Sequence, residues 1–160
     1  TFAKLAGTEA PTDRVIDGVD IRHLFAGDST EADDARVFRY YFINTLQAVR
    51  QGKWKLHLPR PANPPWLGNF SKNNHIAPAD WIAIEEPFLV DLEADPGETS
   101  SVAAAHPEVV ERLLKLAEEA REDIGDYDRV GENMRFFDPQ EARPTRPVFT
   151  KFVSKAKKKK

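Results

Sequence analysis

The sequence has no cysteine among its 160 residues. Disulfide bonds, zinc–thiolate sites and thiol nucleophiles are therefore excluded for this chain. No stretch approaches the roughly 18 consecutive apolar residues that a membrane-spanning helix needs, so we expect no membrane span. We also expect no signal peptide within these residues, because Gly7 and Pro11 interrupt the first apolar stretch too soon.

Positive charge is not in excess either. Lysine and arginine number 23 against 26 acidic residues, which gives a formal net charge of −3. This balance argues against a nucleic-acid partner, because such partners bind basic surfaces. The lysines near the end of the chain offer only weak, salt-sensitive attraction to anions, and we interpret them as a solvated tail.

Four segments have the β-branched, aromatic and alternating composition that is typical of strands. They lie at residues 37–43, 46–50, 54–58 and 88–92, with Gly52 in the turn between the second and the third. Trp54, Leu56 and Leu58 share one face of the third segment, which gives it an apolar side. The pattern predicts a small antiparallel β-sheet.

One amphipathic helix is expected at residues 107–124. Pro107 suits the first helical turn, and apolar residues from Val110 to Ile124 recur at helical spacing. The helix would cover one face of the sheet. The predicted fold class is therefore α+β: a small antiparallel β-sheet with one amphipathic helix packed across it, and long loops.

The remaining segments divide the chain into three parts. Residues 1–35 are interpreted as a helix end closed by Gly7 and a connector, in which residues 28–34 are expected to form an exposed loop. Residues 36–125 hold the α+β domain, and residues 126–160 form an extended tail with a basic end. Within the domain, residues 59–86 form a long proline-bearing loop, and residues 95–98 fit a type II turn with Gly97 at positive φ.

Four segments in this order resemble the C-terminal region of type I sulfatases of the arylsulfatase and N-acetylgalactosamine-6-sulfatase kind, in the alkaline-phosphatase superfamily. They are residues 1–7 (TFAKLAG), 13–21 (DRVIDGVDI), 40–56 with Tyr40-Tyr41 and then LQAVRQGKWKL, and 89–99 (LVDLEADPGET). The resemblance covers most of residues 1–125. It implies that residues 1–35 are the end of the last catalytic-domain helix and the connector that follows it.

The resemblance also implies a chemistry that this chain does not carry. Sulfatases hydrolyse sulfate esters with a formylglycine, made from Cys or Ser in a C/S-x-P-x-R motif, and with a calcium ion. This chain has no cysteine, and none of its serines is followed by proline two residues later. We therefore expect no catalytic residue, metal ligand or cofactor here. Calcium and formylglycine would belong to an absent catalytic domain, and this chain alone is expected to be inactive.

The partners implied by the resemblance are the chain's own catalytic domain and a sulfated small molecule or sulfated carbohydrate. The family also implies a periplasmic or secreted location. Three residues are candidates for the substrate rim: His75 and Trp81 in the long loop, and Asn44 at the end of the first strand. Loops held by a rigid scaffold often carry binding residues.

Other histidines and carboxylates have simpler explanations. Asp17, Asp20 and His23 lie close in sequence, as metal ligands do, but a turn aspartate, a helix cap and a surface histidine explain them better. His57 lies on the polar face of its strand and is expected to be solvated, because the sequence shows no positioned partner for acid–base work.

Two alternative functions stay open. The chain could be a stand-alone α+β binding or interaction module. It could also be the same part of a related hydrolase of phosphate or phosphonate esters, in which case the deciding residues would lie outside this chain.

Overall fold

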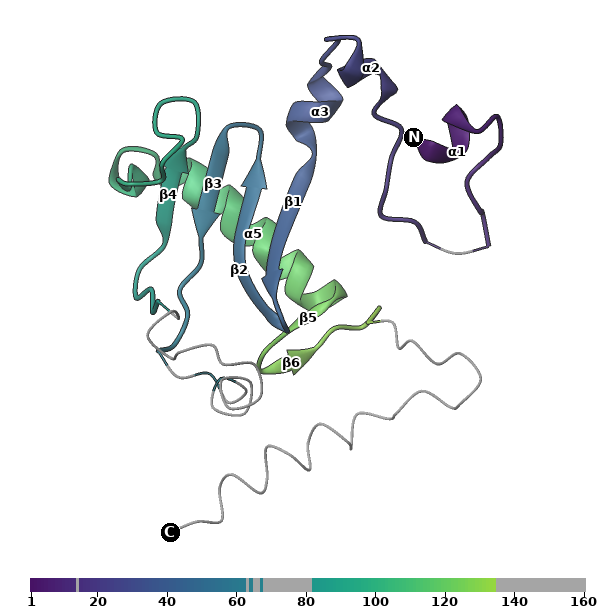
Figure 1. The fold of residues 1–160 in the computed structure, drawn as a ribbon. Coiled ribbons are helices and arrows are strands. Elements are labelled where there is room, and N and C mark those ends of the chain that lie inside the picture. The colour runs from purple at the N-terminus through teal and green to yellow at the C-terminus, as the bar shows by residue number, and fades with distance from the viewer. Residues whose placement is uncertain (14, 63, 65–66, 68–81, 135–160) are drawn as a thin grey trace. The chain divides into compact units, whose positions relative to one another are not determined.

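The structure is a computed structural model, and it describes residues 1–13, 15–62, 64, 67 and 82–134 (Figure 1). The chain divides into two compact units, Thr1–Arg36 and Val37–Lys160.

The first unit contains the short helices α1 (Phe2–Leu5), α2 (Arg22–Phe25) and α3 (Glu31–Ala35). None of these three helices contains a buried residue, so polar contacts order the unit. The Asp33 carboxylate accepts hydrogen bonds from the backbone and hydroxyl of Thr30 and contacts His23 Nε2 at 2.8 Å. Hydrogen bonding from His23, and then from Thr30, lowers the pKa of Asp33 to about 2.

The expectation of a loop at residues 28–34 was wrong from Glu31 onward. Thr30 and Asp33 form a capping box, which supplies partners for the first backbone N–H groups of α3. The short helix closed by Gly7 is confirmed, since Gly7 follows α1 with a φ of 73°. A left-handed glycine at that position is a common helix stop.

The second unit is built on a sheet that has four strands among the described residues. β1 (Val37–Phe42), β2 (Thr45–Gln51), β3 (Trp54–His57) and β4 (Phe88–Asp91) lie in the order β1-β2-β3-β4 and pair antiparallel. The register shifts between Tyr40 and Tyr41, where β2 has one extra residue opposite β1. The predicted α+β fold with a small antiparallel sheet is confirmed.

The core lies between this sheet and one helix, α5 (Pro107–Asp123), which crosses one face of the sheet (Figure 1). The buried residues of α5 are Val109, Leu113, Ala117 and Ala120. They pack on the apolar sheet residues Leu46, Val49, Leu56 and Leu89 and on Leu58, which follows β3 directly. The predicted helix is confirmed, although its buried stripe begins at Val109 rather than Val110, and Ile124 is 41% exposed.

Two further elements lie around α5. A short 3-10 helix, η2 (Ala103–Ala105), precedes it, and a two-stranded hairpin of β5 (Gly125–Asp126) and β6 (Arg129–Val130) follows it. The hairpin was not predicted, because two-residue strands are too short to show a pattern.

The turn at residues 95–98 differs from the predicted type II turn. Gly97 does not have a positive φ, whereas Glu98 does, at 56°. The carboxylate of Asp95 accepts hydrogen bonds from the backbone N–H groups of Thr99 and Ser100, which fixes the chain just after the turn. These side-chain bonds, rather than glycine freedom, set the turn and place Glu98.

Candidate functional site

Ile43 and Asn44 form the two-residue turn between β1 and β2. Ile43 has a φ of 58°, in the left-handed region that a β-branched residue strongly disfavours. Such a conformation costs about 1–3 kcal/mol and persists only where the surrounding structure enforces it. Because strain of this kind concentrates at binding and active sites, the turn is a candidate functional position.

A cavity of about 640 Å³ is lined in part by this turn. This volume falls within the roughly 300–1,000 Å³ that is usual for small-molecule sites. The apolar side of the lining comes from Ile43, Ile124, Val130 and Met134, and the polar side includes Asn44, Asp128 and Arg129. The lining of the cavity therefore combines apolar side chains with the exposed polar residue Asn44.

Asp126 holds the wall that β5 contributes to the cavity. Its side chain is 3% exposed and contacts Arg121 Nε at 2.8 Å. The other carboxylate oxygen accepts hydrogen bonds from the backbone N–H groups of Leu46, at 3.0 Å, and Tyr127, at 2.7 Å. Three hydrogen-bond donors compensate for the cost of burying this charge. The same hydrogen bonds connect β2 to the hairpin after α5.

Tyr41 provides a second connection between the sheet and the end of α5. Its hydroxyl donates a hydrogen bond to the carbonyl of Gly125 at 2.9 Å. Burial, assisted by the negative charge of Asp126, raises the pKa of Tyr41 to about 12. Gly125 itself has a φ of 109°, and a Cβ there would lie 2.7 Å from the backbone nitrogen of Gly131, so only glycine fits.

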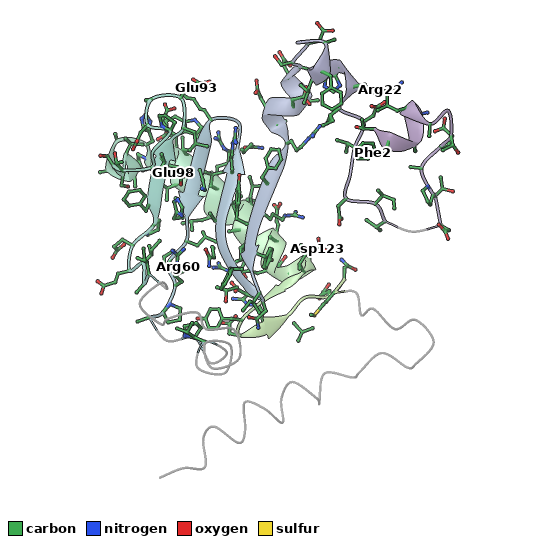
Figure 2. The ribbon with its side chains drawn as sticks, viewed as in Figure 1. Phe2, Arg22, Arg60, Glu93, Glu98 and Asp123 are labelled. Atoms are coloured by element: carbon green, nitrogen blue, oxygen red, sulfur yellow. The ribbon has the colours of Figure 1, made fainter. Side chains whose placement is uncertain are left out.

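A second polar cluster lies on the sheet face opposite α5. Lys55 and His57 alternate with the core residue Leu56 along β3, so they point away from the helix. The Glu98 carboxylate, labelled in Figure 2, contacts Lys55 Nζ at 2.6 Å and His57 Nε2 at 2.5 Å. Burial alone raises the pKa of Glu98, but these hydrogen bonds outweigh it and leave the pKa below its ordinary value.

The expectation that His57 is solvated was wrong, because its side chain is 22% exposed and bonded to Glu98. A carboxylate on one ring nitrogen can orient an imidazole for acid–base work. Here the same carboxylate also neutralises Lys55, and all three side chains come from β3 and the loop after β4. These contacts fix the loop after β4 to the sheet.

Of the three candidate rim residues, the structure places one. Asn44 lies in the wall of the cavity. His75 and Trp81 lie outside the described residues. Contact of any of the three with substrate stays a prediction. The sequence analysis did not identify Ile43 or Asp126 as site residues. The one local signal was Gly125, whose capacity for a left-handed conformation indicates that the chain reverses after α5.

Within the described ranges, no group of three or more His, Asp or Glu side chains is arranged to hold a metal ion. Asp20 instead pairs with Arg22, whose hydrogen bond lowers the pKa of Asp20 to about 2, and His23 pairs with Asp33. Among the helices that are described, none has the length and apolar character to cross a membrane.

Comparison with known proteins links the chain to sulfatases. A family model for the C-terminal region of aryl-sulfatase matches residues 33–147. The chain is 36% identical over 126 residues to steryl-sulfatase of Mus musculus, covering 71% of this chain and 20% of that protein. It is 32% identical over 132 residues to arylsulfatase of Hemicentrotus pulcherrimus, and the match covers 74% of this chain and 24% of that protein. For N-acetylgalactosamine-6-sulfatase of Sus scrofa, the identity is 32%, with coverage of 72% and 23%.

A solved structure described as a sulfatase from the metabolism of multiple glycosaminoglycans by Bacteroides thetaiotaomicron is also similar. Its TM-score is 0.50 at 30% identity, over 75% of this chain and 23% of that chain. The chain thus spans between a fifth and a quarter of the length of the curated relatives described above.

Proposed function

The chain belongs to the family formed by the C-terminal region of aryl-sulfatases, and from this we propose that it is the C-terminal domain of an enzyme that hydrolyses sulfate esters. The observation that carries the proposal is the family match over residues 33–147, together with the sheet and helix that these residues form. The relatives are named as sulfatases, which favours sulfate esters over the phosphate or phosphonate esters of a related hydrolase.

The residues of this chain do not fit the groups that sulfatase chemistry requires. A formylglycine needs a Cys or Ser precursor two residues before proline, and this sequence has no such residue. The described residues also lack a cluster of carboxylates and histidines that fits a metal ion. Formylglycine and calcium would therefore belong to a catalytic domain in another part of the polypeptide, and the present chain alone would not turn over substrate.

In this proposal the domain packs against the catalytic domain and forms part of the edge of its active site. Asn44 supports a role at the edge of the active site, because it lies on the strained turn that lines the cavity. His75 and Trp81 are proposed as the other rim residues. A sulfated small molecule or a sulfated carbohydrate is the substrate class that agrees with the names of the relatives.

The activity test uses 4-nitrophenyl sulfate with two proteins: the 160-residue chain alone, and the longer polypeptide that contains it. We expect sulfate release from the longer polypeptide only. Turnover by the 160-residue chain would refute the assignment of the chemistry to another domain. Hydrolysis of 4-nitrophenyl phosphate in place of the sulfate would favour the phosphatase alternative.

The rim role is tested in the longer polypeptide with Asn44→Ala, His75→Ala and Trp81→Ala. Removing a side chain that contacts substrate is expected to lower kcat/KM about tenfold or more for at least one sulfate ester, corresponding to about 1.4 kcal/mol. Asn133→Ala is the matched control, because Asn133 is exposed and is not part of the cavity lining. Unchanged kcat/KM for all three variants on aryl, steryl and sugar sulfates would exclude the rim role.

A further inference from the structure

The cavity beside the β1–β2 turn is built by two parts of the second unit that are far apart in the sequence. One wall comes from β1 and the turn after it. The other comes from the end of α5 and the β5–β6 hairpin, which lie at the same end of the sheet (Figure 1). The bonds from Asp126 to Leu46 and from Tyr41 to Gly125 hold the two walls together. A cavity that is fixed in advance in this way loses little further freedom when a ligand binds.

The inner surface of the cavity is mainly apolar. Its lining includes Ile43, Ile124, Val130 and Met134. Ile43 and Ile124 are 48% and 41% exposed, although both are large apolar residues. Ile43 is in addition held at a φ of 58°, a strained conformation of the kind that persists at ligand-binding positions. These features are typical of a wall that contacts the apolar part of a ligand.

The charged side chains of the lining do not favour a sulfate group inside the cavity. Among the described residues of the lining, Arg129 is the one cation, and it is already paired with Glu118 and, at 3.6 Å, with Asp128. The lining also contains the carboxylates of Asp126 and Asp128. Because these carboxylates repel an anion, the sulfate end of an ester would lie outside the cavity, and the uncharged part would lie inside.

Few uncharged polar groups of the lining are available for the hydroxyl groups of a sugar. The Tyr41 hydroxyl is bonded to the backbone, and the Asp126 carboxylate is shared by Arg121 and two backbone N–H groups. In the described lining this leaves the amide of Asn44 and the hydroxyl of Tyr127. Burial raises the pKa of Tyr127, which keeps its hydroxyl neutral at pH 7. Since each buried hydroxyl without a partner is costly, the cavity fits an apolar body with one or two polar groups better than a carbohydrate.

We propose that this cavity holds the uncharged part of the substrate, and that the substrate is the sulfate ester of an apolar phenol or alcohol, with an aryl or steroid ring system, rather than a sulfated sugar. This inference rests on the proposed function. The names of the relatives leave both classes open, since they include steryl-sulfatase and arylsulfatase as well as N-acetylgalactosamine-6-sulfatase. The apolar wall and the occupied polar groups of this chain decide between them. The ring system would lie against Ile43 and Ile124, with Asn44 beside its polar end.

Binding of neutral ring systems to the 160-residue chain tests the cavity directly. The probes are 2-naphthol and estrone, and N-acetylgalactosamine and inorganic sulfate are compared at the same concentrations. Calorimetry measures Kd, and amide chemical shifts locate the ligand. We expect saturable binding of the two ring systems, with shifts at Ile43 and Ile124, and no binding of the sugar or of sulfate. Failure of both ring systems to bind, or tighter binding of the sugar, would overturn the inference.

Two substitutions place a polar group in the apolar wall. Val130→Thr keeps the shape of the side chain and its strand propensity, and Ile124→Asn changes a residue that is already partly exposed. Each is expected to weaken Kd for the ring systems about tenfold. The matched controls are Val19→Thr and Ile82→Asn, the same substitutions at exposed residues outside the lining, and their Kd should stay within about twofold of wild type. Circular dichroism verifies that each variant is folded, and unchanged Kd in both folded cavity variants would show that the ligand does not lie in this cavity.

Hydrolysis by the longer polypeptide separates this inference from the proposed function. The value of kcat/KM should be higher for 2-naphthyl sulfate and estrone sulfate than for N-acetylgalactosamine 6-sulfate. Ile124→Asn should lower it about tenfold for the two ring esters, mainly by raising KM, and leave the value for the sugar sulfate unchanged. A preference for the sugar sulfate would overturn the inference while the proposed function stands. Release of sulfate from none of the three esters would refute the proposed function and, with it, the substrate role of the cavity.

Discussion

Asp126 offers the sharpest test of how the second unit is held together. Its carboxylate lies between two parts of the chain that are far apart in sequence, because Leu46 belongs to β2 and Arg121 to the end of α5. The carboxylate side chain is 3% exposed, so water cannot replace a lost partner. Two substitutions, Asp126→Asn and Asp126→Ala, separate the contributions of its two oxygens.

The expected magnitudes follow from the contacts of each oxygen. Asparagine keeps an oxygen for the N–H groups of Leu46 and Tyr127 but places an NH₂ group against Arg121. It loses one charge-assisted hydrogen bond, which costs about 1.5–3 kcal/mol. Alanine also leaves the buried N–H of Leu46 without its partner, which adds about 1–3 kcal/mol. The total for alanine is about 2.5–6 kcal/mol, a range that includes the roughly 3–5 kcal/mol that other broken buried pairs cost.

Urea unfolding at pH 7, followed by tryptophan fluorescence and circular dichroism, measures these differences in the free energy of unfolding. The controls are Asp128→Asn and Asp128→Ala, two residues along, where the side chain is 51% exposed. These should change stability by about 0.5 kcal/mol or less. Equal losses for Asp126→Asn and Asp126→Ala would refute the role of the Leu46 N–H bond. Losses in the free energy of unfolding no larger than those of the Asp128 variants would refute the claim that Asp126 connects β2 to the end of α5.

Two further predictions concern pH. The pKa of Glu98 is below its ordinary value of 4.5 in the folded state, so its contribution to stability is present above pH 4.5 and is lost as pH falls through the folded pKa. Glu98→Gln should therefore lower the urea midpoint at pH 7, and the gap from wild type should close on acidification; a constant gap down to pH 3 would contradict this. Burial raises the pKa of Tyr41 from 10.0 to about 12, so its contribution is present below pH 10 and is lost as pH rises toward 12. Tyr41→Phe should cost about 1 kcal/mol at pH 7 through the lost bond to Gly125, and should lose less stability than wild type in alkaline unfolding; parallel pH profiles would show that Tyr41 is not the group involved.

Much of the sheet and helix could be predicted because their signals are local. Alternation in β1 and β3, Gly52 at the hairpin and Pro107 at the helix start each act within a few neighbouring residues. The shift of the buried stripe from Val110 to Val109 shows where this reasoning is less accurate. Two adjacent valines fit the periodic pattern almost equally, and only the placement of α5 against the sheet decides between them.

The predictions of a loop at residues 28–34 and of a type II turn at residues 95–98 were wrong for another reason. In both, a side-chain oxygen competes with the expected backbone conformation. The oxygens of Asp33 and Asp95 accept hydrogen bonds from nearby N–H groups and so override the composition of the segment. Such signals are visible as Thr-x-x-Asp and Asp-x-x-x-Thr spacings, but the sequence offers several competing uses for each aspartate.

The sequence by itself determined the α+β class, the strand boundaries to within a residue or two, the resemblance to sulfatases, and the absence of a formylglycine precursor from this chain. Those properties depend on residue types and short spacings. Tertiary structure alone decided that Glu98 meets His57 across 41 positions and that Asp126 meets Leu46 across 80. It also decided that Ile43 is strained and exposed next to Asn44. Contacts over such separations depend on how the sheet, α5 and the last hairpin pack together, and no local pattern along the chain encodes that packing.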